Sequence, residues 1–410
     1  MKDILIKNAR VVDGTTDRAK DAVDILLAEG EIKDIGPSLK ALRDVKVIDA
    51  RDLFVMPGLI DAHVHVIAQD ANLKQNAVIP DTIITVAAMK LMAAMLTRGF
   101  TTVRDLGGAT GPFRMAMELA PIALPRLNIC GKALSQTGGH TDQRGPFESK
   151  PVPDWPVPLG ALGVICDGEP QLRQAAREQF RTGADFLKVM ASGGVSSPSD
   201  PIHFLGFSRA ELLAAVEEAE NTGTYVSAHL YTDEAILRAV ECGVYSLEHC
   251  NLITAKTARL AVEKGCIACP TLITYDKLQS EGAAMGLPAA SIAKVDDVRL
   301  RGIESLSIMQ EAGLPMAYGS DLLGGMQRHQ SGEFELRGQV LSNQTVIQST
   351  TLIAAKLLRM EGQIGTLQPG AFADVLVLER DPLKDLSVLS GQGDGIRTIV
   401  KGGEIIKHLC

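Results

Sequence analysis

The sequence has no run of basic residues and no long apolar stretch. Its 410 residues carry a formal net charge of −8 at pH 7, and this acidic balance without a basic patch argues against a nucleic-acid-binding surface. No uninterrupted apolar run approaches the roughly 20 residues that a membrane-spanning helix needs. The N-terminal stretch MKDILIKNARVVDG carries charges throughout, unlike a signal peptide. We therefore expect a soluble protein that binds neither nucleic acid nor membrane.

Cysteine is also scarce. The seven cysteines are odd in number and scattered, which favours a reducing compartment such as the cytoplasm. Cys266 and Cys269 have the CxxC spacing of zinc and redox motifs, but no second pair or following histidine accompanies them. The surrounding residues predict a strand, in which positions three apart point to opposite faces. We therefore predict a structural role for this pair and a cytoplasmic location for the protein.

Both ends of the chain have the residue patterns of short β-strands. AEGE and KGGE place glycine at two expected hairpin turns. The simplest arrangement joins the two ends in one small sheet domain, with the middle of the chain inserted between its halves. The expected strands cover residues 4–12, 23–36, 46–50, 372–379 and 396–407.

The middle, residues 57–360, alternates short apolar strands with helical segments. Ser208 and Glu211 form a capping box before the helical pattern LLAAVEEAE, and Gly223 ends that helix. Strands separated by helices over about 300 residues predict a (β/α)₈ barrel. The eight strand candidates are residues 59–66, 100–107, 126–134, 185–193, 224–230, 244–250, 266–272 and 314–321.

Histidines gather at the C-terminal ends of these predicted strands, where barrel enzymes place their active sites. Only eight histidines occur in the chain, and four of them lie at such ends. His63 and His65 are two apart on a strand, so both side chains face the same way and can bind one metal ion. Imidazole and carboxylate ligands suit zinc or a similar divalent ion. The predicted ligands at the strand ends are His63, His65, His229, His249 and Asp321.

Lys188 is unexpected where it stands. It lies between Leu187 and Val189 in the apolar strand DFLKVM, although lysine is rarely buried unless it is paired or chemically altered. One explanation is a structural ion pair with Asp185 or another acid. The alternative is a chemical change that removes the buried positive charge.

The chain resembles the amidohydrolase superfamily of metal-dependent hydrolases over nearly its whole length. The resemblance implies a (β/α)₈ barrel at residues 57–360 and a small β-sandwich built from residues 1–56 and 361–410. The motifs that carry it are VMPGLIDAHVH, AHLYTDEAILRAVECGVYSLEH, YGSD and GQIGTLQPGAFADVLVLERDPL.

This resemblance also offers an explanation for Lys188. In relatives with two metal ions the lysine of the fourth strand is carboxylated by carbon dioxide, and its carbamate bridges the ions. Such a change turns an amine with a pKa of about 10.4 into an anion. Relatives with one ion lack this lysine, so its presence implies two divalent ions, with zinc as the expected metal. Asp321 is then expected to take a proton from the attacking water and pass it to the leaving nitrogen.

Among relatives, the chain is most similar to a binuclear branch near imidazolonepropionase that cleaves dipeptides and other N-acyl amino acids. The resemblance implies a prolidase-like (Xaa-Pro) enzyme that forms homo-oligomers. Alternatives are a dipeptidase for C-terminal Arg or Lys, an amidase for other N-acyl amino acids, and a cyclic amide or lactone hydrolase. A non-catalytic scaffold is disfavoured, because every ligand position is filled. The candidate binders of the substrate carboxylate are His140, Tyr231, Arg144 and Arg328.

The choice between proline and a basic C-terminal residue stays open in the sequence. A basic side chain would need an acidic pocket, and the connection from Gln136 to Pro170, a candidate lid, is rich in acids. Such long connections usually carry binding functions. Its acids are Asp142, Glu148, Asp154, Asp167 and Glu169.

Overall fold

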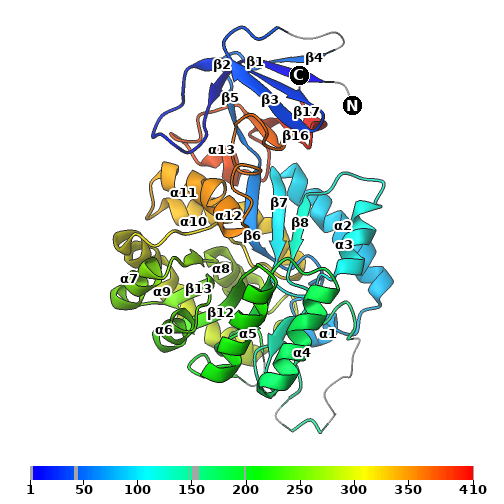
Figure 1. Cartoon of the computed structure of the whole chain (residues 1–410), viewed down its shortest axis with the longest axis vertical. Helices are drawn as coiled ribbons and strands as arrows, with labels where there is room; N and C mark the ends of the chain where they lie inside the picture. Colours follow the sequence, from blue (N-terminus) through cyan, green and yellow to red (C-terminus); the bar gives the residue numbers. More distant parts are fainter. Residues whose placement is uncertain (1–2, 41–44, 146, 150–156, 198–199, 410) are drawn as a thin grey trace.

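The structure is a computed structural model that describes residues 3–40, 45–145, 147–149, 157–197 and 200–409. An eight-stranded sheet contains strands from both ends of the chain and lies at one end of the long axis (Figure 1). Its central strand β5 (Phe54–Pro57) pairs in parallel with β1 (Ile4–Val11) and antiparallel with β15 (Val375–Leu378). The predicted union of the two chain ends in one sheet is therefore confirmed. The remaining strands are β2 (Ala22–Ala28), β3 (Glu31–Gly36), β4 (Lys46–Asp49), β16 (Ile396–Lys401) and β17 (Glu404–His408).

The two predicted hairpins turn at paired residues with positive φ. Glu29 and Gly30 have φ angles of 54° and 82°, and Gly402 and Gly403 have 55° and 79°. Two successive residues in this region make a type I′ turn, whose twist matches that of the flanking strands. The strands that they join, β2 with β3 and β16 with β17, are antiparallel.

Parallel strands form the centre of the rest of the molecule. The strands β6 (Leu59–Val64), β7 (Phe100–Asp105) and β8 (Arg126–Ile129) make one sheet. A second sheet has the order β10-β9-β11-β12-β13-β14. Its strands are β9 (Ala133–Ser135), β10 (Gly163–Ile165), β11 (Leu187–Met190), β12 (Val226–Thr232), β13 (Ser246–Leu252) and β14 (Ile267–Cys269).

Two predicted strands differ from their expected form. The third candidate is divided into β8 and β9, because Gly131 between them has a φ of 70° and interrupts the extended chain. The eighth candidate is reduced to one parallel bridge between Met316 and Ala268 of β14. It ends early because the amides of Ser320 and Asp321 both donate to the carbonyl of His63, which bends the chain.

The eighth segment nevertheless connects the two parallel sheets. The amide of Ala317 donates to the carbonyl of Ala268 in β14 at 2.8 Å, and the amide of Ala62 in β6 donates to the carbonyl of Tyr318 at 2.8 Å. The segment therefore brings Asp321 beside the end of β6. The unpredicted β10 lies within the long connection and pairs in parallel with β9.

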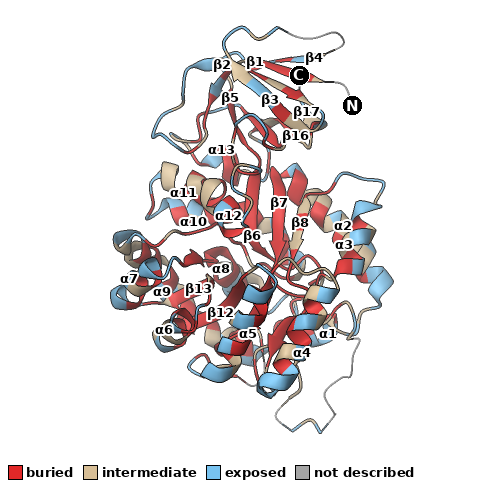
Figure 2. Cartoon of the chain, in the orientation of Figure 1, coloured by how far each residue is buried: buried red, intermediate tan, exposed pale blue. Residues whose placement is uncertain are grey.

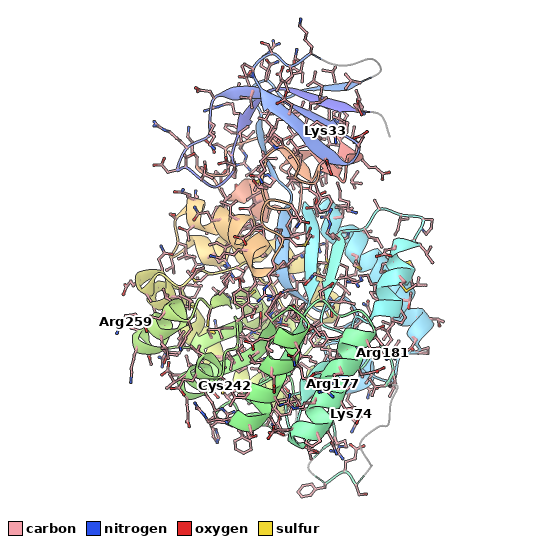
Figure 3. The ribbon with its side chains drawn as sticks, viewed as in Figure 1. Lys33, Lys74, Arg177, Arg181, Cys242 and Arg259 are labelled. Carbon is pink, nitrogen blue, oxygen red and sulfur yellow. The ribbon has the colours of Figure 1, made fainter. Side chains whose placement is uncertain are left out.

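Helices cover the parallel strands, with their inner faces buried and their outer faces exposed (Figures 1 and 2). Charged side chains such as Arg177 and Arg181 stand on the outer face of α4 (Figure 3). Among the described residues, no helix combines the length and apolar character that crossing a membrane requires. The helices are α1 (Leu73–Asn76), α2 (Asp81–Thr97), α3 (Gly111–Glu118), α4 (Gly168–Arg181), α5 (Arg209–Asn221), α6 (Asp233–Glu241), α7 (Ala255–Glu263), α8 (Leu272–Glu281), α9 (Ala289–Ala312), α10 (Glu333–Gly338), α11 (Asn343–Ser349), α12 (Leu352–Leu357) and α13 (Ser387–Ser390), with a 3₁₀ helix at Gly324–Gly332.

The predicted capping box at the start of α5 is confirmed. The Ser208 hydroxyl accepts from the amide of Glu211, whose carboxylate accepts from the amide of Ser208. Gly223 follows the helix with a φ of 74°. Cys266 and Cys269 are both buried free thiols.

Candidate active site

One cavity of about 350 Å³ is lined by nearly all of the site residues that the sequence predicts. Arg328 is the exception, because its half-exposed guanidinium binds the carboxylate of Glu281 and the carbonyl of Gly325 instead of lining the cavity. The predicted residues in the lining are His63, His65, His140, Arg144, Lys188, His229, Tyr231, His249 and Asp321.

Imidazoles and a carboxylate converge on one side of this cavity. Asp321 Oδ1 lies 3.3 Å from Nε2 of His63 and 3.3 Å from Nε2 of His65. Donor atoms of His63, His249 and Asp321 all lie within 4.8 Å of one another. Nitrogen and carboxylate donors gathered around one point have the chemistry and spacing of a divalent metal site. The donor set therefore fits a divalent ion.

The rings of His63 and His65 are fixed from behind. Nδ1 of His63 lies 2.8 Å from Oε2 of Glu248, and Nδ1 of His65 lies 3.1 Å from the carbonyl oxygen of Gly107. Carboxylates and carbonyls only accept hydrogen bonds, so Nδ1 carries the proton in both rings. Nε2 is therefore the nitrogen that is turned toward the cavity and can bind a metal ion there, which is the arrangement of a metal-binding histidine with its supporting partner.

The other two histidines are held differently. Nδ1 of His249 lies 2.8 Å from Oγ1 of Thr271. For His229 it is Nε2 that lies 3.2 Å from a carbonyl oxygen, that of Gly193. Since Nε2 must donate this bond, Nδ1 is the nitrogen of His229 that can bind a metal ion.

The backbone is strained at two of these positions. His249 and Asp321 have φ angles of 70° and 50°, in the left-handed region that costs a non-glycine residue about 1–2 kcal/mol. Such conformations persist where the surrounding structure fixes them, and they cluster at functional sites. Both side chains line the cavity, His249 from within β13 and Asp321 from the segment that follows Met316.

Two residues that the sequence analysis missed support His63. Glu248 on β13 and Arg104 on β7 are completely buried, and Arg104 donates to Glu248 Oε1 at 2.9 Å. Ser227 donates to the same oxygen at 2.7 Å. The sequence does hold a signal for these two residues, because each is a charged residue within a predicted strand, as Lys188 is.

Cys269 lies close to the same carboxylate. Its thiol belongs, with His63 and Glu248, to a second group of possible ligand atoms. Burial raises the pKa of this thiol well above its ordinary value, and the oxygens of Glu248 already accept from His63 and Arg104. The thiol is therefore part of the packing behind the cavity.

Electrostatics set the protonation of the polar groups. Burial opposes the charge of Asp321, but the His63 imidazole lowers the pKa of this carboxyl well below its ordinary value. Burial likewise opposes the charge of Glu248, and Arg104 holds its pKa well below the ordinary value. Burial lowers the pKa of His229 and His249 well below the usual range. These two rings are therefore neutral, as metal ligands must be.

Lys188 lines the cavity and is only 1% exposed. Burial lowers its pKa, which Glu248 partly opposes. Within the described residues its amine makes no hydrogen bond or ion pair, and the proposed pairing with Asp185 is wrong. Asp185 instead binds the guanidinium of Arg114 at 2.7 Å and the amide of Ile129 at 2.8 Å. The structure thus leaves Lys188 in the lining of the same cavity as His229, His249 and Asp321.

The candidate carboxylate binders differ in how their polar atoms are engaged. His140 places Nδ1 3.1 Å from Oδ2 of Asp200. Arg144 forms two bonds of 2.9 and 2.7 Å to Asp142, so much of its charge is neutralised there.

Tyr231 has a partner that the sequence analysis missed. Its hydroxyl accepts a 3.0 Å hydrogen bond from the hydroxyl of Tyr275, a buried residue of α8 that also lines the cavity. Because Tyr275 supplies the donor, the proton of Tyr231 is available to another acceptor. No pattern in the sequence pointed to Tyr275.

The rest of the wall is largely apolar. Next to the polar cluster it offers aliphatic side chains that a non-polar part of a ligand can contact. Examples are Leu73, Val78, Val157, Leu162, Ile165, Met190, Val195, Leu278 and Leu323.

The chain is similar to several known proteins. The sequence model of the amidohydrolase family matches residues 54–405. Ochratoxinase from Aspergillus niger is 31% identical over 372 residues, which cover 86% of this chain and 75% of that protein. A solved amidohydrolase structure has a TM-score of 0.97 at 46% identity, covering 100% of both chains. A solved prolidase complexed with N-methylphosphonate-L-proline has a TM-score of 0.96 at 40% identity, again covering 100% of both chains.

Proposed function

Because the chain belongs to the amidohydrolase family of hydrolytic enzymes, we propose that it is a binuclear metal-dependent hydrolase of dipeptides and other N-acyl amino acids. Xaa-Pro dipeptides are the preferred substrates. One observation carries this proposal: a single cavity holds the convergent metal-type donors together with His140 and Tyr231, against an apolar wall. The similarity to a prolidase structure supports the same substrate class.

The proposal includes the architecture of the chain. Residues 57–360 form a (β/α)₈ barrel, supported by the hydrogen bonds that connect the segment around Met316 to β14 and β6. Residues 1–56 and 361–410 form a β-sandwich. The mutual hydrogen bonds of Ile32 with Gly370 and Ala371, which draw β3 toward the C-terminal strands, support this second domain.

The metal-binding residues follow from the donor atoms. Two divalent ions, with zinc the best match to these donors, would supply Lewis acidity toward the amide carbonyl and toward water. The residues that would hold them are His63 and His65 for one ion and His229 and His249 for the other, together with Asp321 and carboxylated Lys188.

The chain's own residues then divide the remaining work. Asp321, kept anionic by its imidazole neighbours, takes a proton from the attacking water and returns it to the leaving nitrogen. The Tyr231 hydroxyl and the His140 ring bind the carboxylate of the substrate. The apolar wall receives the non-polar side chains and excludes water from the reacting bond.

The acids of the cavity favour proline over a basic C-terminal residue. Asp142 is bound by Arg144, and Glu148 is bound by Lys74. Asp154 lies outside the described residues, and Asp167 and Glu169 are not among the residues that line the cavity. Since the described acids of the cavity mouth are neutralised by cations, a substrate arginine or lysine would have to displace an existing ion pair.

A dipeptide panel tests the proposal. Metal-loaded protein should cleave Xaa-Pro faster than Xaa-Arg and Xaa-Lys, and should cleave each free acid faster than its carboxamide. Losing a charge-assisted hydrogen bond should lower kcat/KM by roughly 10- to 150-fold. Equal rates on acid and amide would contradict carboxylate recognition, and cyclic amides and lactones would then become the substrates to test.

A further inference from the structure

We propose that Lys294 and Asp200 are positioning residues, which hold His140 where it receives the carboxylate of the substrate. The inference rests on the proposed function, because it concerns how the same cavity recognises its ligand. Neither residue lines the cavity. Lys294 comes from α9 and Asp200 from the loop that follows β11, the strand of Lys188.

Lys294 uses its whole donor capacity on this one loop. Its ammonium donates to the backbone carbonyls of Gly194, Ser197 and Asp200 at 3.1, 3.0 and 3.0 Å. An ammonium has three N–H donors, and all three bind one short segment. Within the described part of the chain, Lys294 has no carboxylate partner. The contacts therefore tie Gly194, Ser197 and Asp200 to α9.

Both ends of that loop hold the His140 ring. At one end Asp200, 2% exposed, accepts from Nδ1 of His140 at 3.1 Å and sets the rotation of the ring. At the other end Gly194 lies against the ring so closely that a Cβ atom would stand 2.0 Å from its Cε1.

The ring also has an aromatic neighbour. His140 stacks on His229 with a centroid distance of 4.3 Å and an interplanar angle of 14°. Contacts with Gly194 and His229 therefore restrict the ring, and Asp200 turns Nδ1 away from the ligand. Nε2 is left as the nitrogen that can meet a substrate oxygen, and a ring that donates from both nitrogens is the imidazolium, a cation that suits a carboxylate. Because Lys294 fixes both Gly194 and Asp200, it controls this placement without touching the substrate.

The test compares an acid with its amide. Lys294→Met should lower kcat/KM for an Xaa-Pro free acid about 10-fold, chiefly through KM, since the hydrogen bond that His140 makes to the carboxylate is worth at least that factor. The matching carboxamide should change less than about 2-fold. Lys294→Arg, whose guanidinium also supplies enough donors, should recover most of the loss. Asp200→Asn should act in the same direction as Lys294→Met.

Controls separate positioning from general destabilisation. Arg301→Met removes a cation of the same helix that pairs with exposed Glu304, and it should leave the kcat/KM for both acid and amide unchanged. Circular dichroism and Tm of each variant report folding. If Lys294→Met and Asp200→Asn lower kcat/KM equally for the acid and the amide, the inference is wrong. A purely structural role would affect both substrates alike.

A binding measurement distinguishes failure of the inference from failure of the proposed function. Calorimetry on metal-loaded protein should show that L-proline binds the wild type about 10-fold more tightly than Lys294→Met, as expected from the same hydrogen bond. If the wild type cleaves no dipeptide but Lys294→Met still weakens proline binding, only the proposed function fails. If Lys294→Met binds proline as tightly as the wild type does, the inference is wrong whatever the activity.

Discussion

Oε2 of Glu248 lies 2.8 Å from Nδ1 of His63, and both side chains are buried. This contact holds the ring so that Nε2 faces Asp321, 3.3 Å away. A carboxylate behind a metal-binding histidine fixes its orientation and raises its basicity. Arg104 balances the charge of that carboxylate from the opposite side at 2.9 Å. The arrangement of the donors is therefore built into the core before any ligand binds.

Glu248→Gln should weaken metal binding about 10- to 100-fold, because an amide carries no charge to polarise the His63 ring. It also leaves the buried Arg104 guanidinium without its anion, which should cost stability of about 3–5 kcal/mol. The double variant Glu248→Gln with Arg104→Met should regain much of that stability but not the metal affinity. Chelator competition and urea unfolding measure the two effects, and unchanged metal affinity would refute the supporting role of Glu248.

A second prediction concerns Lys188. Metal analysis should give about two divalent ions per chain, the number that a bridged pair requires, and electron density at Lys188 should extend beyond the amine. Lys132 is an internal control. It too is buried, and burial lowers its pKa to about 7, but its amine donates to four carbonyls. Density at Lys132 should therefore end at Nζ. One ion with a bare Lys188 would favour the single-metal members of the family.

A third prediction separates chemistry from binding. Asp321→Asn should keep the fold and much of the metal but lower turnover by about 10²–10⁴-fold, the range of general acid–base assistance. Asp276→Asn removes a partly exposed carboxylate of α8 that pairs with Lys277 and should leave kcat unchanged. Steady-state kinetics and metal content of both variants provide the comparison. Near-normal turnover in Asp321→Asn would mean that another group carries the proton.

The pH dependence of stability should involve Glu218 between α5 and α4. Hydrogen bonds from Arg177 lower the pKa of Glu218 against the opposing effect of burial, and Arg173 adds a further bond. The folded state thus releases this proton more easily than the unfolded state, whose glutamate pKa is about 4.3. The stabilisation is complete above that pH and is lost as the pH falls through the lower folded pKa.

Glu218→Gln should therefore be less stable than the wild type at pH 7, and the difference should shrink toward pH 3. Urea unfolding at the two pH values measures it. Glu220→Gln, on the same helix but without an ion pair among the described residues, should show little difference at either pH. If the difference in free energy of unfolding between wild type and Glu218→Gln stays constant with pH, the lowered pKa of Glu218 does not contribute to stability.

Features that depend on residues close together in the sequence could be predicted from it. His63 and His65 are two positions apart at the end of β6, and the ends of successive parallel strands meet at one edge, so the lining of the cavity followed from strand order. The capping box at Ser208 and the glycine hairpins likewise depend on a few neighbouring residues. These signals need no knowledge of distant contacts.

Features that depend on distant partners were missed. Arg104 and Glu248 are 144 positions apart, and neither residue alone indicates the other. Asp185 is close to Lys188 in sequence and was therefore a plausible partner. In the structure Asp185 binds Arg114 instead, which is 71 positions away. Arg328 lies outside the cavity lining for a similar reason, because its guanidinium binds Glu281. Side-chain pairing across elements decides these cases.

The last prediction concerns the hydrogen bond from Tyr275 to Tyr231. The donor of Tyr275 occupies an acceptor site on the Tyr231 oxygen at 3.0 Å and so directs the Tyr231 proton elsewhere, toward a substrate carboxylate. Tyr275→Phe should lower kcat/KM for the free acid by about 2- to 12-fold, the effect of one neutral hydrogen bond, with little change for the carboxamide. Tyr245→Phe is the matched control, because that hydroxyl bonds to the carbonyl of Lys356.

Combining the changes tests the mechanism of this effect. If Tyr275 acts only through Tyr231, the double variant Tyr231→Phe with Tyr275→Phe should be no worse on the free acid than Tyr231→Phe alone, because the hydroxyl that Tyr275 orients is already gone. Residues in direct contact show such non-additive effects. Additive losses would instead mean that Tyr275, which also lines the cavity, contacts the substrate itself.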